Sequence, residues 1–261
     1  MDPGPLRDAL TVVLGVITGI LSGLFGVGGA VISTPGIRAL GALPLIAVGS
    51  TLPSIIPGAA TGTARYLRER LIDARVVALT APFGAAAAIA GAALADVIPG
   101  DGHALMFATA ALLAYSAWRM WAKAQRDAAG IEPPARAVDP PRLALAVIGI
   151  AAGFVSGLLG IGGGVLMVPA FTQRVGLPIK AAIATSLACV AIFAMPGTIT
   201  HAIEGNIDWR LALLLAAGVI PGSWLGAHLT VIAKEATVQR VVALFLGATA
   251  VLFAVGEVIA L

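Results

Sequence analysis

The chain has 261 residues, of which 59% are hydrophobic and 11% are charged, and its mean hydropathy is +1.00. Soluble domains carry about 25% charged residues, so this composition excludes a soluble globule. With a single cysteine, Cys189, the chain can form neither an intrachain disulfide nor a cysteine-based zinc site. The net charge is +3, and the sequence has no cluster of basic and aromatic residues that would indicate nucleic-acid binding.

Eight apolar segments follow one another, most of them near the roughly 20 residues that cross about 30 Å of hydrocarbon. They run over Leu6–Ile37, Leu43–Ala64, Val76–Ile98, His103–Trp121, Leu143–Phe171, Ile179–His201, Leu211–Ile232 and Val238–Leu261. The first has no small-residue cleavage site, so we expect it to be retained rather than removed as a signal peptide. We therefore expect one all-α polytopic domain, residues 1–261, in the cell membrane, with no cofactor and no metal.

The first segment contains GLFGVGGAV, residues Gly23 to Val31, with four glycines in nine positions. Glycine is a poor helix former, and each unpaired backbone group in hydrocarbon costs several kcal/mol. Irregular backbone at this depth is tolerated only where protein or a watery cavity surrounds it. The stretch is therefore either a device for close helix packing or part of a site.

A polar stretch, Ala122 to Arg142, separates the fourth and fifth segments and holds four prolines. Its composition is typical of a linker, which divides the chain into residues 6–121 and 143–261. The two parts resemble each other: SGLFGVGGAVISTP from Ser22 and SGLLGIGGGVLMVP from Ser156 share eight of fourteen positions. Further Gly, Pro and Asp landmarks recur in the same order, which predicts two homologous four-segment repeats.

The distribution of lysine and arginine distinguishes parallel from inverted repeats. If all eight segments cross the membrane, the 16 basic residues divide 11 to 5 between the two sides. If each glycine-rich segment instead enters and returns as a re-entrant hairpin, the repeats are inverted and the division becomes 13 to 3, with Arg7, Arg38 and Arg210 on the minor side. The positive-inside rule favours the inverted model, which is a common plan of secondary transporters.

The glycines of the two segments are the first candidate site. Breaks in two helices would present successive N–H groups to a centre, where helix N-termini and such nests favour anions. Close packing through small residues is the alternative. Recurrence and density favour a substrate site, and its candidate residues are Gly26, Gly28, Gly29, Gly160, Gly162, Gly163 and Gly164, flanked by Ser22 and Ser156.

Two hydroxyl pairs, Ser50 with Thr51 and Thr185 with Ser186, follow the glycine-rich segments in both repeats. Hydroxyls in membrane helices commonly bond back to a carbonyl of the preceding turn. The recurrence of the pairs makes them our candidates for neutral hydrogen-bond donors to an anionic substrate. His201 either carries a proton for coupled transport or is an interfacial histidine at a helix end.

Three more residues have a structural interpretation. Asp73 and Asp208 match across the repeats and stand at the starts of segments, where we expect them to cap helix N-termini rather than contact substrate. Cys189 follows the second hydroxyl pair, and we expect it to be a buried thiol.

The recurring SGLxGxGGxxxxxP pattern, AIATSL (Ala182 to Leu187) and HAIEGNIDWR (His201 to Arg210) resemble the TauE/SafE sulfite exporter family over essentially the whole chain. The resemblance implies a transporter, usually an exporter, of small sulfur-containing anions such as sulfite, sulfoacetate or other sulfonates. The first repeat departs from the pattern: Ala30 replaces the glycine found at Gly164, and Tyr66 stands where the second repeat has His201. The repeats therefore cannot contribute equally to a site.

Together these features predict a secondary transporter that works by alternating access, with an anion site at the repeat interface. An anion channel would use the same residues. An intramembrane enzyme is the third reading, but the apolar segments offer neither a metal-binding pattern nor a nucleophile with its base. The expected partners are a small anion and the lipid bilayer, and the sequence leaves a homodimer open.

Overall fold

The computed structural model describes residues 4–95, 103–128, 141–159 and 162–260, which form ten helices and no strand. The helices are α1 (Pro5–Phe25), α2 (Ala30–Ala39), α3 (Pro44–Arg68), α4 (Ala74–Ala95), α5 (His103–Ala128), α6 (Arg142–Leu159), α7 (Gly164–Gln173), α8 (Ile179–Ile203), α9 (Trp209–Ile232) and α10 (Glu235–Ala260).

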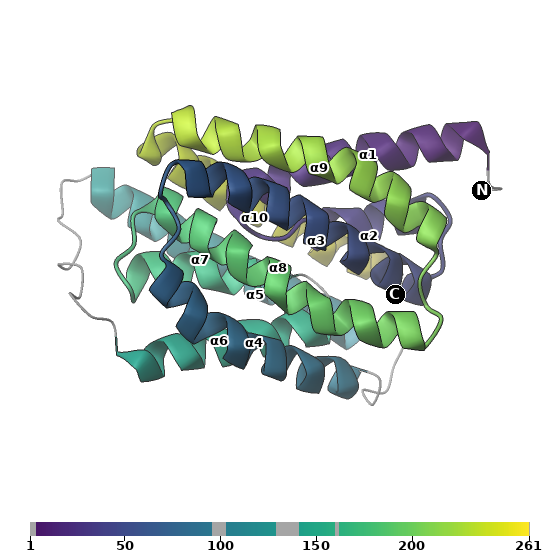
Figure 1. Ribbon diagram of the computed structural model, residues 1–261, viewed down its shortest axis with the longest axis horizontal. Coiled ribbons are helices and arrows are strands. Elements are labelled where there is room, and N and C mark those ends of the chain that lie inside the picture. Colours follow the sequence, from purple (N-terminus) through teal and green to yellow (C-terminus); the bar gives the residue numbers. More distant parts are fainter. Residues whose placement is uncertain (1–3, 96–102, 129–140, 160–161, 261) are drawn as a thin grey trace.

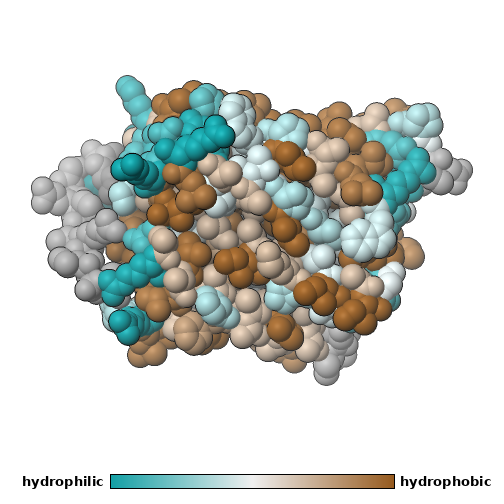
Figure 2. All heavy atoms as spheres, in the orientation of Figure 1, coloured by the Kyte–Doolittle hydropathy of each residue, from teal (hydrophilic) through white to brown (hydrophobic). Residues whose placement is uncertain are grey.

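The helices lie roughly along the long axis of the molecule (Figure 1). Six of them are long and apolar enough to cross a bilayer. On the face seen in Figure 2, hydrophilic residues gather toward the two ends of this axis and hydrophobic residues cover the middle. This distribution fits a multi-pass membrane protein whose helices run through the hydrocarbon with their ends at the two surfaces.

The first and fifth apolar segments each form two helices. The chain leaves helical geometry after Phe25, and α2 then returns alongside α1, because Gly36 lies against Leu14 and Gly29 against Thr18. Likewise, α7 follows α6, with Gly163 against Ala152. Each glycine-rich stretch therefore lies between two helices rather than within one.

One helix is longer than the apolar segment that predicts it. The fourth apolar segment ends near Trp121 and the expected linker runs from Ala122 to Arg142, whereas α5 continues to Ala128. Alanine, lysine, glutamine and arginine in this stretch are good helix formers, and no glycine or proline stops the helix. Residues 129–140 of the expected linker lie outside the described residues.

Two seams of glycine bring helices into close contact across the chain. A Cβ at Gly15, Gly19 or Gly23 of α1 would overlap a carbonyl oxygen of α9, at Leu215, Val219 and Ser223 respectively. In the other seam, a Cβ at Gly149, Gly153 or Gly157 of α6 would overlap a carbonyl oxygen of α4, at Thr80, Gly84 and Ala88. Small residues allow the backbones of two helices to approach this closely, which increases their van der Waals contact. Such contact matters in a membrane because lipid chains are as apolar as the side chains, so the hydrophobic effect does not drive the helices together.

The core is centred on α8, whose side chains from Ala182 to Leu187 are buried. Tyr66, at the end of α3, is fully buried, and its hydroxyl donates to the carbonyl of Gly23 at 2.6 Å. This bond fixes α3 to α1 next to the first glycine-rich stretch.

We expect Gly19→Leu to lower the melting temperature in detergent, with a cost at or above the upper end of the about 1–3 kcal/mol seen for overpacking. The reason is that the neighbour of position 19 is the α9 backbone, which cannot yield as a side chain can. Ile17→Leu is the matched control, because Ile17 lies on the same helix and is 47% exposed. Equal melting temperatures for the two variants would contradict the packing of this seam.

Candidate functional site

The first glycine stretch forms a tight, irregular connection between α1 and α2. Gly26, Gly28 and Gly29 have φ angles of 67°, 90° and 79°, a region that side chains rarely tolerate. Gly26 ends α1, and its N–H donates to the carbonyl of Ser22 at 2.9 Å. Gly29 precedes α2, and its carbonyl accepts the N–H of Ser33 at 3.1 Å.

The second stretch has the same form where the structure describes it. Gly162 and Gly163 have φ angles of 88° and 64°, and Gly164 is the first residue of α7. Gly163 precedes α7 as Gly29 precedes α2. Gly160, the remaining predicted site glycine, lies outside the described residues.

The two stretches contact each other inside the protein. A Cβ at Gly28 would lie 3.7 Å from the Cα of Gly162, and a Cβ at Gly162 would lie 2.8 Å from the carbonyl oxygen of Val27. A Cβ at Gly164 would overlap the carbonyl oxygen of Gly26. The structure therefore brings the predicted site glycines of both halves together, at a distance that only glycine permits.

Several N–H groups at this contact have no acceptor within the part of the chain that the structure describes. Among the hydrogen bonds of the described residues, none uses the amides of Gly28, Gly29 and Ala30 before and at the start of α2. The same holds for Gly163 and Val165 at the start of α7, whereas the N–H of Gly164 donates to the carbonyl of Gly162 at 2.7 Å. Two buried helix N-termini thus meet, each with N–H donors that find no acceptor among the described residues, and such an arrangement favours an anion.

The four predicted hydroxyls are all buried, and each has a protein partner. The Ser186 hydroxyl donates to the carbonyl of Gly26 at 2.9 Å, which joins α8 to the first glycine stretch. The Thr51 hydroxyl bonds within its own helix, to the carbonyl of Ala47 at 2.8 Å. Of the four, Ser186 is therefore the one that binds a site glycine.

Ser50 and Thr185 have a different kind of partner, a backbone N–H group. The Ser50 hydroxyl oxygen accepts the N–H of Asp208 at 2.9 Å, and the Thr185 hydroxyl oxygen accepts the N–H of Asp73 at 3.1 Å. Each bond joins a helix of one half to a loop of the other half. The signal was present in the repeat alignment, which pairs Ser50 with Thr185 and Asp73 with Asp208, but only the fold shows that the pairs cross.

The aspartates cap helices, as predicted. The Asp208 carboxylate accepts the N–H groups of Arg210 and Leu211, and that of Asp73 accepts the N–H groups of Arg75 and Val76, at 2.9–3.2 Å. Their backbone N–H groups are therefore held in place to bond Ser50 and Thr185.

The remaining predicted residues lie as follows. Ser22 is buried beside the first stretch and Ser156 is half-buried on α6. His201 lies near the end of α8, with its Nδ1 3.7 Å from the carboxylate of Glu204. Cys189 is fully buried, as predicted.

Comparison with known proteins gives a consistent family. The model of the family described as sulfite exporter TauE/SafE matches residues 11–253. The probable membrane transporter protein YunE of Bacillus subtilis is 29% identical over 245 residues, which cover 84% of this chain and 86% of the relative. A probable membrane transporter protein of Xylella fastidiosa is 27% identical over 222 residues, 84% of each chain.

No solved structure gives a significant match. The sequence pattern, the helices long enough to span a bilayer and the family match nevertheless agree with one another. The chain is a multi-pass membrane protein that belongs to the TauE/SafE sulfite exporter family of membrane transporters.

Proposed function

We propose that this protein is a secondary transporter that exports small sulfur-containing anions across the cell membrane by alternating access. Sulfite, sulfoacetate and related sulfonates are the proposed substrates, and the family description supports this class. The proposed binding residues are the two glycine stretches with Ser22, Ser156 and the hydroxyl pairs, and Ser186 is the hydroxyl best placed among them.

The free amides at the start of α2 and α7 carry this proposal. An unpaired N–H group in hydrocarbon costs several kcal/mol, so the five that lack an acceptor among the described residues at this contact would be stabilised by an occupant or water. A helix N-terminus favours negative charge, and neutral donors hold an anion without a fixed positive charge. Such donors suit a carrier, because it must release its substrate on the other side.

Ser186 would join these donors when the two stretches separate. In the described state its hydroxyl is bonded to the carbonyl of Gly26, and Gly164 lies against the same carbonyl. Separation of the stretches would open space for an anion and free this hydroxyl to donate to it. The described state is then one in which the site is closed by the contact itself.

Two inverted repeats, residues 6–121 and 143–261, form the transport unit in this proposal. The glycine seams support it, because α1 contacts α9 at the positions that correspond to those joining α6 and α4. Figure 1 gives a second support: N and C lie toward one end of the long axis, whereas α5 ends and α6 begins at the other. An inverted plan with re-entrant glycine hairpins gives this arrangement.

The crossed hydroxyl bonds would act as alternating latches. Ser50 bonds the loop before α9, and Thr185 bonds the loop before α4, so the two bonds lie toward opposite ends of the helices. Opening of one side would break one bond and leave the other intact. Each bond contributes about 0.5–1.5 kcal/mol, which is small enough to be exchanged during transport.

We expect topology reporters to place the Ala122 to Arg142 region in the cytoplasm and both termini outside. This orientation puts 13 of the 16 basic residues on the cytoplasmic side. Reporter fusions before α1, between α5 and α6, and after α10 test it. A cytoplasmic N-terminus together with an α1 that spans the membrane would contradict the inverted model.

We expect the purified protein in liposomes to transport sulfite or sulfoacetate across the membrane without altering it chemically. If transport of the anion is coupled to transport of a proton, the flux should respond to a pH gradient. In that case His201→Gln should flatten the pH dependence while leaving apparent affinity near normal. A flux at channel rates that does not depend on a pH gradient would indicate a channel instead of a carrier. Conversion of the anion would instead indicate an enzyme.

We expect Ser186→Ala to weaken apparent substrate affinity by roughly tenfold to a hundredfold. A hydrogen bond to a charged partner contributes about 1.5–3 kcal/mol, and 1.4 kcal/mol corresponds to a factor of ten. Thr249→Val is the control, because Thr249 is also buried, and its hydroxyl bonds within α10, to the carbonyl of Phe245, rather than to a site glycine. Concentration dependence of flux separates the two variants, and an unchanged affinity in Ser186→Ala would remove this hydroxyl from the site.

A further inference from the structure

A cavity of about 230 Å³ lies between α5, α6 and α7, away from the contact of the glycine stretches. Its walls are mostly apolar, with Val147, Ile148 and Ala151 from α6 and Leu166 from α7. The side chains of Tyr115 and Val147 are each about half exposed, at 51% and 50%. In a membrane, the exposed parts of these two lining residues would meet lipid, so lipid would lie beside the cavity.

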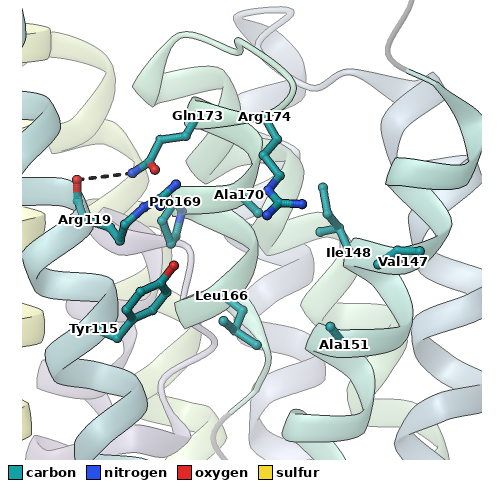
Figure 3. A pocket seen from close by; sticks show the side chains of 10 residues that line it. All are labelled: Tyr115, Arg119, Val147, Ile148, Ala151, Leu166, Pro169, Ala170, Gln173 and Arg174. Atoms are coloured by element: carbon teal, nitrogen blue, oxygen red, sulfur yellow. Dashed lines mark hydrogen bonds between the residues drawn. The ribbon is translucent and has the colours of Figure 1, made fainter.

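One end of the cavity is positively charged. Figure 3 shows Arg119, Gln173 and Arg174 at this end, and Leu166 and Ala151 farther along the wall. Neither arginine forms an ion pair with any residue that the structure describes. Two guanidinium groups with no carboxylate partner among the described residues, beside an apolar wall, provide a site for one negative charge attached to an apolar chain.

Local contacts hold the charged end in shape. The Arg119 guanidinium lies 5.8 Å from the centre of the Tyr115 ring, a cation–π contact. The Gln173 side-chain amide donates to the backbone carbonyl of Arg119 at 3.2 Å, which ties the end of α7 to α5. Arg119 is thereby positioned over the cavity before any ligand binds.

The depth of the arginines fits the headgroup level of a bilayer. Arg174 directly follows the last residue of α7. Trp118 and Trp121, on the same helix as Arg119, are 63% and 43% exposed. Exposed tryptophans on membrane helices concentrate at the interface between hydrocarbon and water, so the arginines lie where lipid phosphates are found.

We propose that this cavity binds an anionic phospholipid, with the phosphate at Arg119 and Arg174 and the start of an acyl chain against Val147, Ala151 and Leu166. A lipid fits better than a free anion, because most of the wall is apolar and two of its residues, Tyr115 and Val147, are half exposed where lipid would meet them. The α7 helix links this site to the glycine contact, since Gln173 ends it and Gly164 begins it. A bound lipid therefore steadies the helix whose N-terminus lies at the transport site.

The test uses full-length protein in nanodiscs of phosphatidylcholine, with and without phosphatidylglycerol, and native mass spectrometry to count bound lipid. We expect phosphatidylglycerol to raise the melting temperature and to remain bound to the wild type. Arg119→Gln with Arg174→Gln should bind it at least tenfold more weakly. Arg126→Gln is the control, because Arg126 is an exposed arginine on α5 outside the cavity.

A second variant keeps the charges and blocks the apolar part. In Ala151→Phe, the larger side chain should fill the apolar part of the cavity, so that the protein loses the lipid although both arginines remain. This variant also covers the case in which the double arginine variant fails to fold. Inorganic phosphate or sulfite in phosphatidylcholine discs should give no such shift. Equal lipid binding in Ala151→Phe, or an equal shift with free phosphate, would overturn the lipid site, the latter in favour of a free-anion site. Because transport is not measured, a failed transport proposal leaves this result unaffected.

Discussion

The contact between the two glycine stretches depends on a single constraint: irregular backbone inside a membrane must be enclosed by protein. If the two stretches carried side chains at these positions, they could not approach each other this closely, because a Cβ at Gly164 would overlap the carbonyl oxygen of Gly26. Glycine therefore allows each stretch to enclose the other. The cost is a set of N–H groups that have no acceptor among the described residues, and in the proposed function these groups would bind the anion.

The seams around this contact have a related cause. Hydrocarbon does not drive apolar helices together, so tight packing must come from surfaces that fit closely. Glycines at intervals of four residues on α1 and α6 provide flat faces for the carbonyl groups of α9 and α4. The helices that lead into the glycine stretches are thus held by partners from the other half of the chain. Movement of either half would be transmitted directly to the contact.

Much of this arrangement could be predicted from the sequence, because its causes are local. The departure from helix geometry at Gly26 to Gly29 and the capping by Asp208 follow from glycine and aspartate acting on their own neighbours. The partners of Ser50 and Thr185 could not be predicted, since each depends on where a distant loop lies. The cavity was missed for the same reason.

In the sequence, the two arginines of this cavity are simply two of the 16 basic residues. Arg119 and Arg174 stand far apart in the sequence and share a wall only because α7 folds back beside α5. The helix α5 exceeds its apolar segment for another reason: polar helix formers extend a helix beyond the hydrocarbon, whereas hydropathy measures only the apolar part.

The hydroxyl of Tyr66 introduces an inequality between the halves. It anchors α3 to the Gly23 carbonyl, while the second half has His201 at the corresponding position. Under alternating access, the two end states would then differ in free energy even without substrate. One hydrogen bond of about 0.5–1.5 kcal/mol shifts a two-state population by up to about tenfold. An empty carrier of this design would rest mostly facing one side of the membrane, and substrate on that side would find its site more often.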